Sequence, residues 1–168
     1  MKQIQRDSKI DVAPATTSNA ALVKLTNTSL ALADAGQDIR GRKVVDRHQD
    51  EIGHVSSLFI DEAERKVRMI EIRAGGLFGI GERHFLVPVD AIAAVDKDEV
   101  HITVTREHIA GSPPYNPDLI EEPTQSNWEP YYGYYGLSPY WGNGYMYPSF
   151  PLTLEQRDRK NRLQIPRD

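Results

Sequence analysis

The stretch Arg73–Ile92, "RAGGLFGIGERHFLVPVDAI", decides how the fold is interpreted, because its glycines could form a phosphate-binding loop or a turn between two strands. A dinucleotide-binding fingerprint needs G-x-G-x-x-G between a strand and a helix. Here His84 stands at the third glycine position after Gly79–Gly81, and the next residues have the character of a strand. A P-loop needs a Lys directly after its last glycine, and this stretch has Glu there. We therefore predict a hairpin loop whose glycines permit positive φ.

Short apolar runs on both sides of this loop predict further strands. "VHITV" (Val100–Val104) alternates apolar and polar residues, which is typical of a strand with one buried face. "IGHVSSLFID" (Ile52–Asp61) and "KVRMIEIRA" (Lys66–Ala74) alternate less regularly, which indicates a bulge or burial on both faces. Pro88 in "FLVPV" cannot donate a ladder hydrogen bond, so we expect it at a sheet edge or a bulge. Short strands separated by charged turns predict an all-β fold, either a small antiparallel barrel or a sandwich.

Composition divides the chain into four segments. Residues 1–37 are small and polar, and we expect a flexible leader, whereas residues 38–112 carry the predicted strands. "TREHIAG" (Thr105–Gly111) ends this β domain with one expected helical turn, capped by its Thr and stopped by its Gly. Residues 113–151 hold all eight Tyr and both Trp among Gly and Pro residues, which predicts a low-complexity tail without a long regular element. Residues 152–168 form a charged C-terminal segment.

The overall composition narrows the class of function. The chain has 168 residues with 20 basic and 24 acidic side chains, and no segment is a basic stripe, which argues against strong nucleic-acid binding. It has no Cys, which excludes disulfides and thiolate catalysis. The sequence shows neither the apolar core of a signal peptide nor a run long and apolar enough to span a bilayer. We therefore expect a cytoplasmic protein that reaches a membrane only through a partner.

The residue pattern predicts neither catalysis nor a cofactor nor a metal site. The five His residues are scattered, without the H-E-x-x-H spacing of a zinc site. "DRHQD" (Asp46–Asp50) offers two carboxylates and an imidazole, but its composition favours a solvated turn over a metal site. Ser56 and Ser57 lie within a predicted strand rather than at the G-x-S-x-G elbow of a hydrolase. His84 borders the glycine loop, where it could pair with a carboxylate or make a partner contact that depends on pH.

The aromatic tail is the first candidate binding surface. Tyr and Trp supply large contact areas with few rotatable bonds, and they dominate interface hot spots. Stacking on nucleic-acid bases usually needs basic residues nearby, and residues 113–151 contain none. Contact with a protein partner, self-association into a homo-oligomer and packing of the tail on its own barrel all remain open. The candidate partner-binding residues of the tail are Trp128, Tyr131, Tyr132, Tyr134, Tyr135, Tyr140 and Trp141.

Several blocks in the middle of the chain, taken together, resemble the PRC-barrel domain family. They are "G-x-x-V-x-D" from Gly41, "I-G-x-V-x-x-L-x-I-D" over Ile52–Asp61, "V-R-x-I-x-I" over Val67–Ile72, "L-V-P-V-D-A-I" over Leu86–Ile92, "T-R-E" at Thr105–Glu107 and "P-x-Y-x-P" over 113–117. The order of the blocks makes the resemblance fairly specific, and it covers residues 38–118. It implies a small, twisted antiparallel β-barrel of about six strands.

The resemblance also implies a class of function. The family includes the cytoplasmic domain of the photosynthetic reaction-centre H subunit and the C-terminal domain of a ribosome maturation factor. Because these relatives dock on larger assemblies, the resemblance implies a non-enzymatic adaptor that binds a protein partner. Two narrower alternatives are an accessory cytoplasmic-side subunit of a reaction-centre-type electron-transfer complex and an accessory factor in ribosome or RNA maturation.

In such a barrel, the stretch "GGLFGIGERHF" becomes the loop between two strands. Leu77, Phe78 and Ile80 are then apolar side chains in a glycine-rich loop where water should surround them. We expect them either to plug one end of the barrel or to contact a partner. Together with His84 they form the second candidate binding surface.

Overall fold

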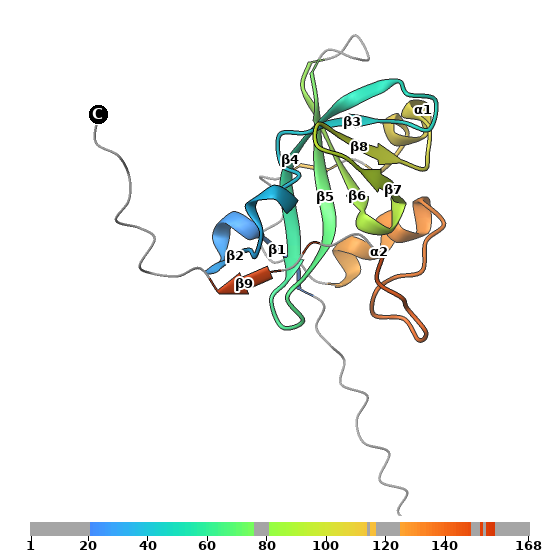
Figure 1. Cartoon of the computed structure of the whole chain (residues 1–168). Helices are drawn as coiled ribbons and strands as arrows, with labels where there is room; N and C mark the ends of the chain where they lie inside the picture. The colour runs from blue at the N-terminus through green and yellow to red at the C-terminus, as the bar shows by residue number, and fades with distance from the viewer. Residues whose placement is uncertain are drawn as a thin grey trace, which may run out of the picture.

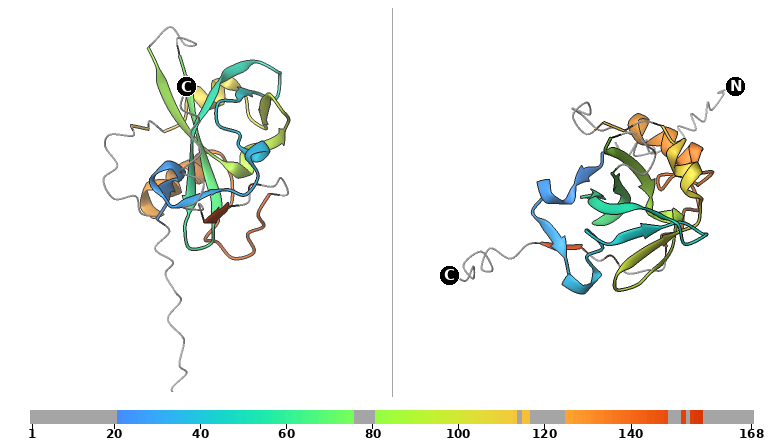
Figure 2. Two further views of the ribbon diagram at one scale, coloured as in Figure 1. Left: turned by 60° about the vertical axis from the view of Figure 1, so that its left-hand side comes forward. Right: turned by 90° about the horizontal axis from the view of Figure 1, so that it is seen from above.

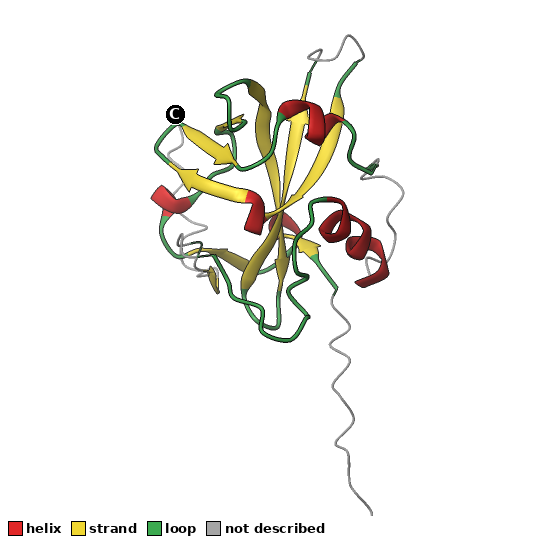
Figure 3. Cartoon of the chain, turned by 90° about the vertical axis from the view of Figure 1, so that its right-hand side faces the viewer, coloured by secondary structure: helices red, strands yellow, loops and turns green. Residues whose placement is uncertain are grey.

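The computed structural model describes residues 21–75, 81–113, 115–116, 125–148, 152 and 154–156. Its main feature is a mixed sheet that curls strongly into a half-barrel, with a few short helices beside it (Figures 1, 2 and 3). The strand order is β6-β5-β4-β3-β8-β7, and β1 pairs with β4 away from this path. These strands are β1 (Val23–Lys24), β3 (Lys43–Val45), β4 (Glu51–Asp61), β5 (Lys66–Ala74), β6 (Arg83–Pro88), β7 (Ile92–Val95) and β8 (Glu99–Ile102).

The remaining elements are short. A separate two-stranded sheet pairs β2 (Leu30–Leu32) with β9 (Leu154–Gln156) in antiparallel fashion. The helices are the 3-10 turns η1 (Leu25–Asn27), η2 (Ala35–Gln37) and η3 (Val89–Ala91), and the α-helices α1 (Arg106–Ala110) and α2 (Gln125–Tyr134). Within the described ranges, no helix has both the length and the apolar character needed to cross a membrane.

Most of the local predictions for the β domain are confirmed. β5 and β4 cover the predicted strand stretches, and the β4–β5 pairing shifts register at two places, which are the bulges that the imperfect alternation indicated. Pro88 is the last residue of β6, an edge strand of the sheet. α1 begins after Thr105, whose hydroxyl oxygen accepts a hydrogen bond from the His108 backbone, and it ends at Gly111.

The expectation of a wholly antiparallel barrel is wrong at one pair of strands. β3 runs parallel to β8, with Val44 opposite Val100. Parallel neighbours need a long connection, and the chain supplies it by passing through β4, β5, β6 and β7 between them. Alternation within a strand reports which face is buried but not the direction of the neighbouring strand, so the sequence pattern could not reveal this pair.

The inner face of the curled sheet packs aliphatic side chains against one another. Leu58 of β4, Ile70 of β5 and Val87 of β6 are almost fully buried in one cluster there. Gly53 of β4 lets the backbone of β5 approach closely, because a Cβ atom at this position would lie 2.3 Å from the Arg73 carbonyl oxygen. The interior is therefore filled by side chains, and the polar chemistry of the molecule lies outside it.

The stretch Asp46–Asp50 forms a turn between β3 and β4, which is the interpretation that its composition favoured. The buried Asp46 carboxylate accepts hydrogen bonds from the backbone N–H groups of His48, Asp50 and Arg106 at 2.7, 2.9 and 2.9 Å. Burial alone would raise the pKa of Asp46, but these three backbone donors outweigh it and hold that pKa below its usual value. The carboxylate thus ties this turn to the start of α1.

The segment expected to be a flexible leader is structured from residue 21 onward. Leu22, Leu25 and Leu30 are buried, β1 extends the main sheet beside β4, and β2 pairs with β9. Leu152 and Leu154 from the expected charged C-terminal segment are buried in the same interior cluster as Leu25 and Leu30. Both ends of the described chain therefore help to close the half-barrel, because its curled sheet alone leaves apolar surface open.

The tail also differs from its expectation, because it contains the ten-residue helix α2. Gly and Pro disfavour such a helix, and Pro130 lies inside it. Three of its four aromatic side chains, Trp128, Tyr131 and Tyr132, are nevertheless buried, with Trp128 at 0% exposure and Tyr132 at 1%. Burial of this area outweighs the weak intrinsic preference for a helix, since tertiary packing supplies most helix stability in proteins.

Candidate functional site

The outer face of β4, β5 and β6 is divided into an apolar half and a polar half. The apolar half carries Phe59, Met69 and Leu86, which are buried in a second cluster together with Leu22. Residues 125–148, here called the aromatic cover, pack over this half, and α2 lies against β6 (Figure 1). β4, β5 and β6 are therefore buried on both faces where the cover lies.

The aromatic residues proposed from sequence for partner binding contact the chain's own sheet in this structure. Trp128, Tyr131, Tyr132, Tyr135 and Tyr140 are buried, and Tyr134 and Trp141 are partly buried. The Trp128 ring lies 5.5 Å from that of Phe59, measured between centroids. This arrangement matches the alternative in which the tail packs on its own barrel.

Tyr134 fixes the cover to α1. Its hydroxyl donates to the His108 carbonyl at 2.7 Å, and its ring stacks on the His108 imidazole with 4.5 Å between centroids. Gly111 leaves space for this side chain, since a Cβ atom there would lie 2.8 Å from the Tyr134 hydroxyl oxygen. Aromatic stacking and a hydrogen bond to the backbone thus hold the two helices together.

A buried arginine holds the far end of the cover. The Arg68 guanidinium lies 4.3 Å from the ring centroid of Tyr140 and within 5.7 Å of those of Tyr145 and Tyr147. Arg68 is 2% exposed, forms an ion pair with Glu64, and lies 4.0 Å from a carboxylate oxygen of Asp61. Cation–π contacts of this kind are strongest when the cation is removed from water, so Arg68 attracts the tyrosines to the sheet.

Two hydroxyl groups add directional bonds to this arginine cluster. Tyr145 donates to Asp90 at 2.7 Å, and Tyr147 donates to the Val67 carbonyl at 3.0 Å. Burial raises the pKa of Asp90 above its usual value, and it raises that of Tyr147 to about 12. These bonds fix the direction in which the cover crosses β5.

The polar half of the outer face centres on a buried carboxylate. Glu71 of β5 is 3% exposed and accepts a hydrogen bond from the Ser56 hydroxyl at 2.5 Å. His84 Nδ1 lies 3.4 Å from the same carboxylate oxygen, while Lys24 Nζ lies 3.8 Å from the other. The structure therefore shows the pairing of His84 with a carboxylate that its position beside the glycine loop suggested.

Further charged side chains surround Glu71. His84 Nε2 lies 3.2 Å from a Glu82 oxygen, and the other Glu82 oxygen lies 3.7 Å from Arg73 Nε. His54 is the register partner of Arg73, which in turn is the register partner of His84. We call His54, Ser56, Glu71, Arg73, Glu82 and His84 the polar face.

The polar face is recessed and contains no nucleophile of the familiar hydrolase type. A hollow of about 420 Å³ is lined by Gly41, His54, Val55, Ser56 and Arg73. The Ser56 hydroxyl donates to the Glu71 carboxylate, whereas a serine hydrolase has the imidazole between the serine and the acid. The arrangement is suited to recognition by hydrogen bonds and charge rather than to acyl transfer.

Leu77, Phe78 and Ile80 lie outside the described residues. The sequence places them in the connection from β5 to β6, between Ala74 and Arg83. The two expectations for them, a plug in the barrel or a partner contact, both stay predictions.

Comparison with known families identifies the domain to which this sheet belongs. Residues 33–109 match the family model for the PRC-barrel domain. These residues are a PRC-barrel domain. PRC-barrel domains are generally non-catalytic. A comparison with curated proteins finds no match.

The match also separates the PRC-barrel domain from its additions. The domain contains β3 to β8, whereas β1, β2, α2 and β9 lie outside the matched range. Sequence reasoning missed the roles of Arg68 and Glu71, although both stand in the otherwise apolar stretch "KVRMIEIRA". The sequence did contain a signal for these roles. The run predicts a strand that is buried on both faces, and a charged residue in such a strand needs a partner.

Proposed function

We propose that this chain is a non-enzymatic docking module whose PRC-barrel domain presents the polar face to a protein partner. The observation that carries the proposal is the Glu71 carboxylate, which is 3% exposed and whose described polar contacts, Ser56, His84 and Lys24, all lie outside the aromatic cover. Burying a charge is costly, and the charge partners of Glu71 are Lys24 of β1 and His84 of β6. Such pre-arranged polar groups beside a recess favour specific recognition.

The loop between β5 and β6 supplies the apolar part of the proposed surface. Leu77, Phe78 and Ile80 follow β5 directly, and His84 stands at the start of β6. Apolar side chains beside a polar rim are the usual composition of a protein interface. The aromatic cover has a different role in this proposal, because it packs on the same face of the sheet beside the docking surface and holds the strands in place there.

Site-specific cross-linking tests the proposal in the full chain. A photo-reactive amino acid replaces Arg73 on the polar face, and in a control chain it replaces the exposed Lys97 on the β7–β8 turn. We expect a discrete cross-linked protein only from position 73, either a different protein or a second copy of this chain. The H84A variant carrying the same probe should give at least tenfold less product.

The opposite results would remove the proposal. Equal products from positions 73 and 97, or full retention of the product in the H84A chain, would show that the polar face does not select a partner. Circular dichroism of each variant checks that the fold is kept, so that a lost product reports recognition.

A further inference from the structure

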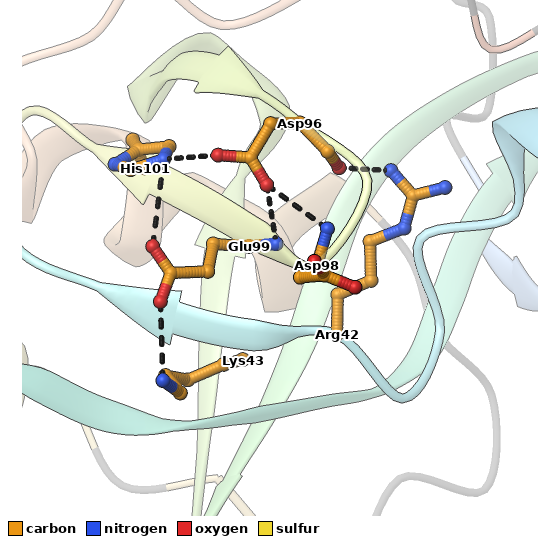
Figure 4. A network of polar contacts seen from close by, with 6 residues as sticks. All are labelled: Arg42, Lys43, Asp96, Asp98, Glu99 and His101. Atoms are coloured by element: carbon orange, nitrogen blue, oxygen red, sulfur yellow. Dashed lines mark hydrogen bonds and ion pairs between the residues drawn. The ribbon is translucent and has the colours of Figure 1, made fainter.

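The hairpin of β7 and β8 brings one imidazole and two carboxylates together at a place separate from the polar face (Figure 4). Asp96 follows β7, while Glu99 and His101 lie two residues apart in β8. His101 Nε2 lies 2.9 Å from Asp96 Oδ2 and 3.8 Å from Glu99 Oε2. One donor atom from each of the three side chains lies within 4.8 Å of the other two.

Each carboxylate has one oxygen fixed by the protein and the other turned toward the imidazole. Asp96 Oδ1 accepts hydrogen bonds from the backbone N–H groups of Asp98 and Glu99 at 2.9 and 2.8 Å. Glu99 Oε1 accepts from Lys43 Nζ at 3.1 Å (Figure 4). Outer contacts of this kind orient metal ligands in proteins.

The backbone beneath these side chains is also braced. Arg42 donates to the Asp96 carbonyl at 2.5 Å (Figure 4). It also donates to the Gly36 carbonyl at 2.7 Å, so the turn is tied to η2.

We propose that Asp96, Glu99 and His101 form a binding site for a divalent transition-metal cation, with Zn²⁺ as the best fit. Bonds of about 2.0–2.2 Å from zinc to nitrogen and oxygen place tetrahedral donors roughly 3.3 Å apart. The observed separations of 2.9 and 3.8 Å from His101 Nε2 bracket this value, so small rotations of the side chains suffice.

The mixed donor set decides the class of metal. Two carboxylates alone would suit Ca²⁺ or Mg²⁺, which take oxygen ligands, whereas the imidazole favours zinc and its neighbours in the transition series. A cation bound at Nε2 needs the neutral imidazole with its proton on Nδ1, so the metal bond takes the place of the contact between His101 Nε2 and Asp96 Oδ2. Three protein ligands leave a fourth position for water, and the cation would brace the edge strand β7 against β8.

Metal titration of the untagged, chelator-treated full chain tests this site without reference to any partner. We expect one Zn²⁺ per chain by isothermal titration calorimetry, with at least tenfold weaker binding in H101Q and in D96N. The matched control is H48Q, which removes an exposed imidazole that also lies beside an Asp, in the turn 46–50. This control should bind Zn²⁺ as the wild-type chain does.

Two readouts keep the test decisive if a variant is poorly folded. In the wild-type chain, Zn²⁺ should shift the ring resonances of His101 more than those of the other His residues, and Co²⁺ should give the intense visible absorption of a tetrahedral site. Equal binding by H101Q and wild type, or ring shifts spread evenly over all five His residues, would show adventitious binding only and overturn the proposal.

Discussion

The two faces of β4, β5 and β6 are buried by different means. Inside, branched aliphatic side chains such as Ile70 and Val87 fill space without any polar atom to satisfy. Outside, the aromatic cover buries Trp128 and Tyr132 but also places hydroxyl groups and the Arg68 cation at defined positions. The stability of the inner face depends on how well its side chains fill space, whereas that of the cover also depends on how its rings and polar groups are oriented. The two faces should therefore respond differently to substitution.

The largest expected effect is on the inner face. Ile70→Ala should lower the free energy of unfolding by about 4 kcal/mol, because it leaves a cavity among side chains that cannot collapse into it. Urea unfolding followed by circular dichroism measures the change. Trp128 and Trp141 both lie in the cover, so their fluorescence should change at the same urea concentration as the sheet signal. Separate transitions would contradict a common core.

A second substitution separates the cover from the interior. Trp128→Ala should lower the stability of the cover by about 3 kcal/mol, because it removes a fully buried side chain. In a urea titration of this variant, the fluorescence of Trp141 should change at a lower urea concentration than the circular dichroism of the sheet. The matched control is Met146→Ala, which alters a side chain that is 84% exposed in the same segment and should cost less than about 0.5 kcal/mol. A single joint transition in the Trp128 variant would show that cover and barrel unfold as one unit.

A smaller effect tests the role of orientation in the cover. Arg68→Ala should cost about 2 kcal/mol, because the guanidinium contacts Tyr140, Tyr145 and Tyr147 while almost fully buried. Lys66→Ala is the control, since its partly exposed ammonium lies 4.7 Å from the centroid of the Tyr147 ring and should contribute less than half as much. Equal losses in the two variants, read from thermal unfolding, would count against the arginine as the organising group.

The smallest expected effect is a pH dependence of the cover. The folded pKa of Asp90 is raised above 3.8 by burial, so the folded state holds the proton more tightly than the unfolded state. This contribution to stability is fully present below pH 3.8 and is lost as the pH rises through the folded pKa. When the pH is lowered from 7 to 4, the free energy of unfolding of the wild-type chain should therefore rise, relative to that of D90N, by less than about 1 kcal/mol. A gain in the opposite direction, measured by urea unfolding at the two pH values, would refute the assignment.

Local features of the PRC-barrel domain could be predicted from the sequence because they depend on residues that are neighbours along the chain. The alternation in "VHITV" predicts β8 in part, since the strand spans Glu99–Ile102 and ends before Thr103 and Val104. The side-chain oxygen of Thr105 caps α1 as its position before "REH" suggested. The turn at Asp46–Asp50 also follows from its composition. The parallel pairing of β3 with β8 depends on the path of the whole chain, and no local pattern encodes it.

The outer face could be predicted only in part. The aromatic residues stood out by composition, but nothing local to residues 113–151 indicates that Phe59, Met69 and Leu86 would receive them. α2 forms despite Pro130 because the sheet offers a surface for its aromatic side chains. The cluster of Asp96, Glu99 and His101 was missed because a hairpin brings into contact residues whose spacing matches no known metal motif.

The pairing of β2 with β9 has a consequence for synthesis of the protein on the ribosome. Leu30–Leu32 leaves the exit tunnel early, whereas its partner Leu154–Gln156 is among the last described residues to emerge. Until then Leu30 cannot reach its native neighbours Leu152 and Leu154, so the growing chain holds an unfinished core and is exposed to aggregation. This domain is therefore expected to complete its fold only after Leu152 and β9 have emerged, and a nascent chain stalled before residue 152 should be more sensitive to protease than the full chain.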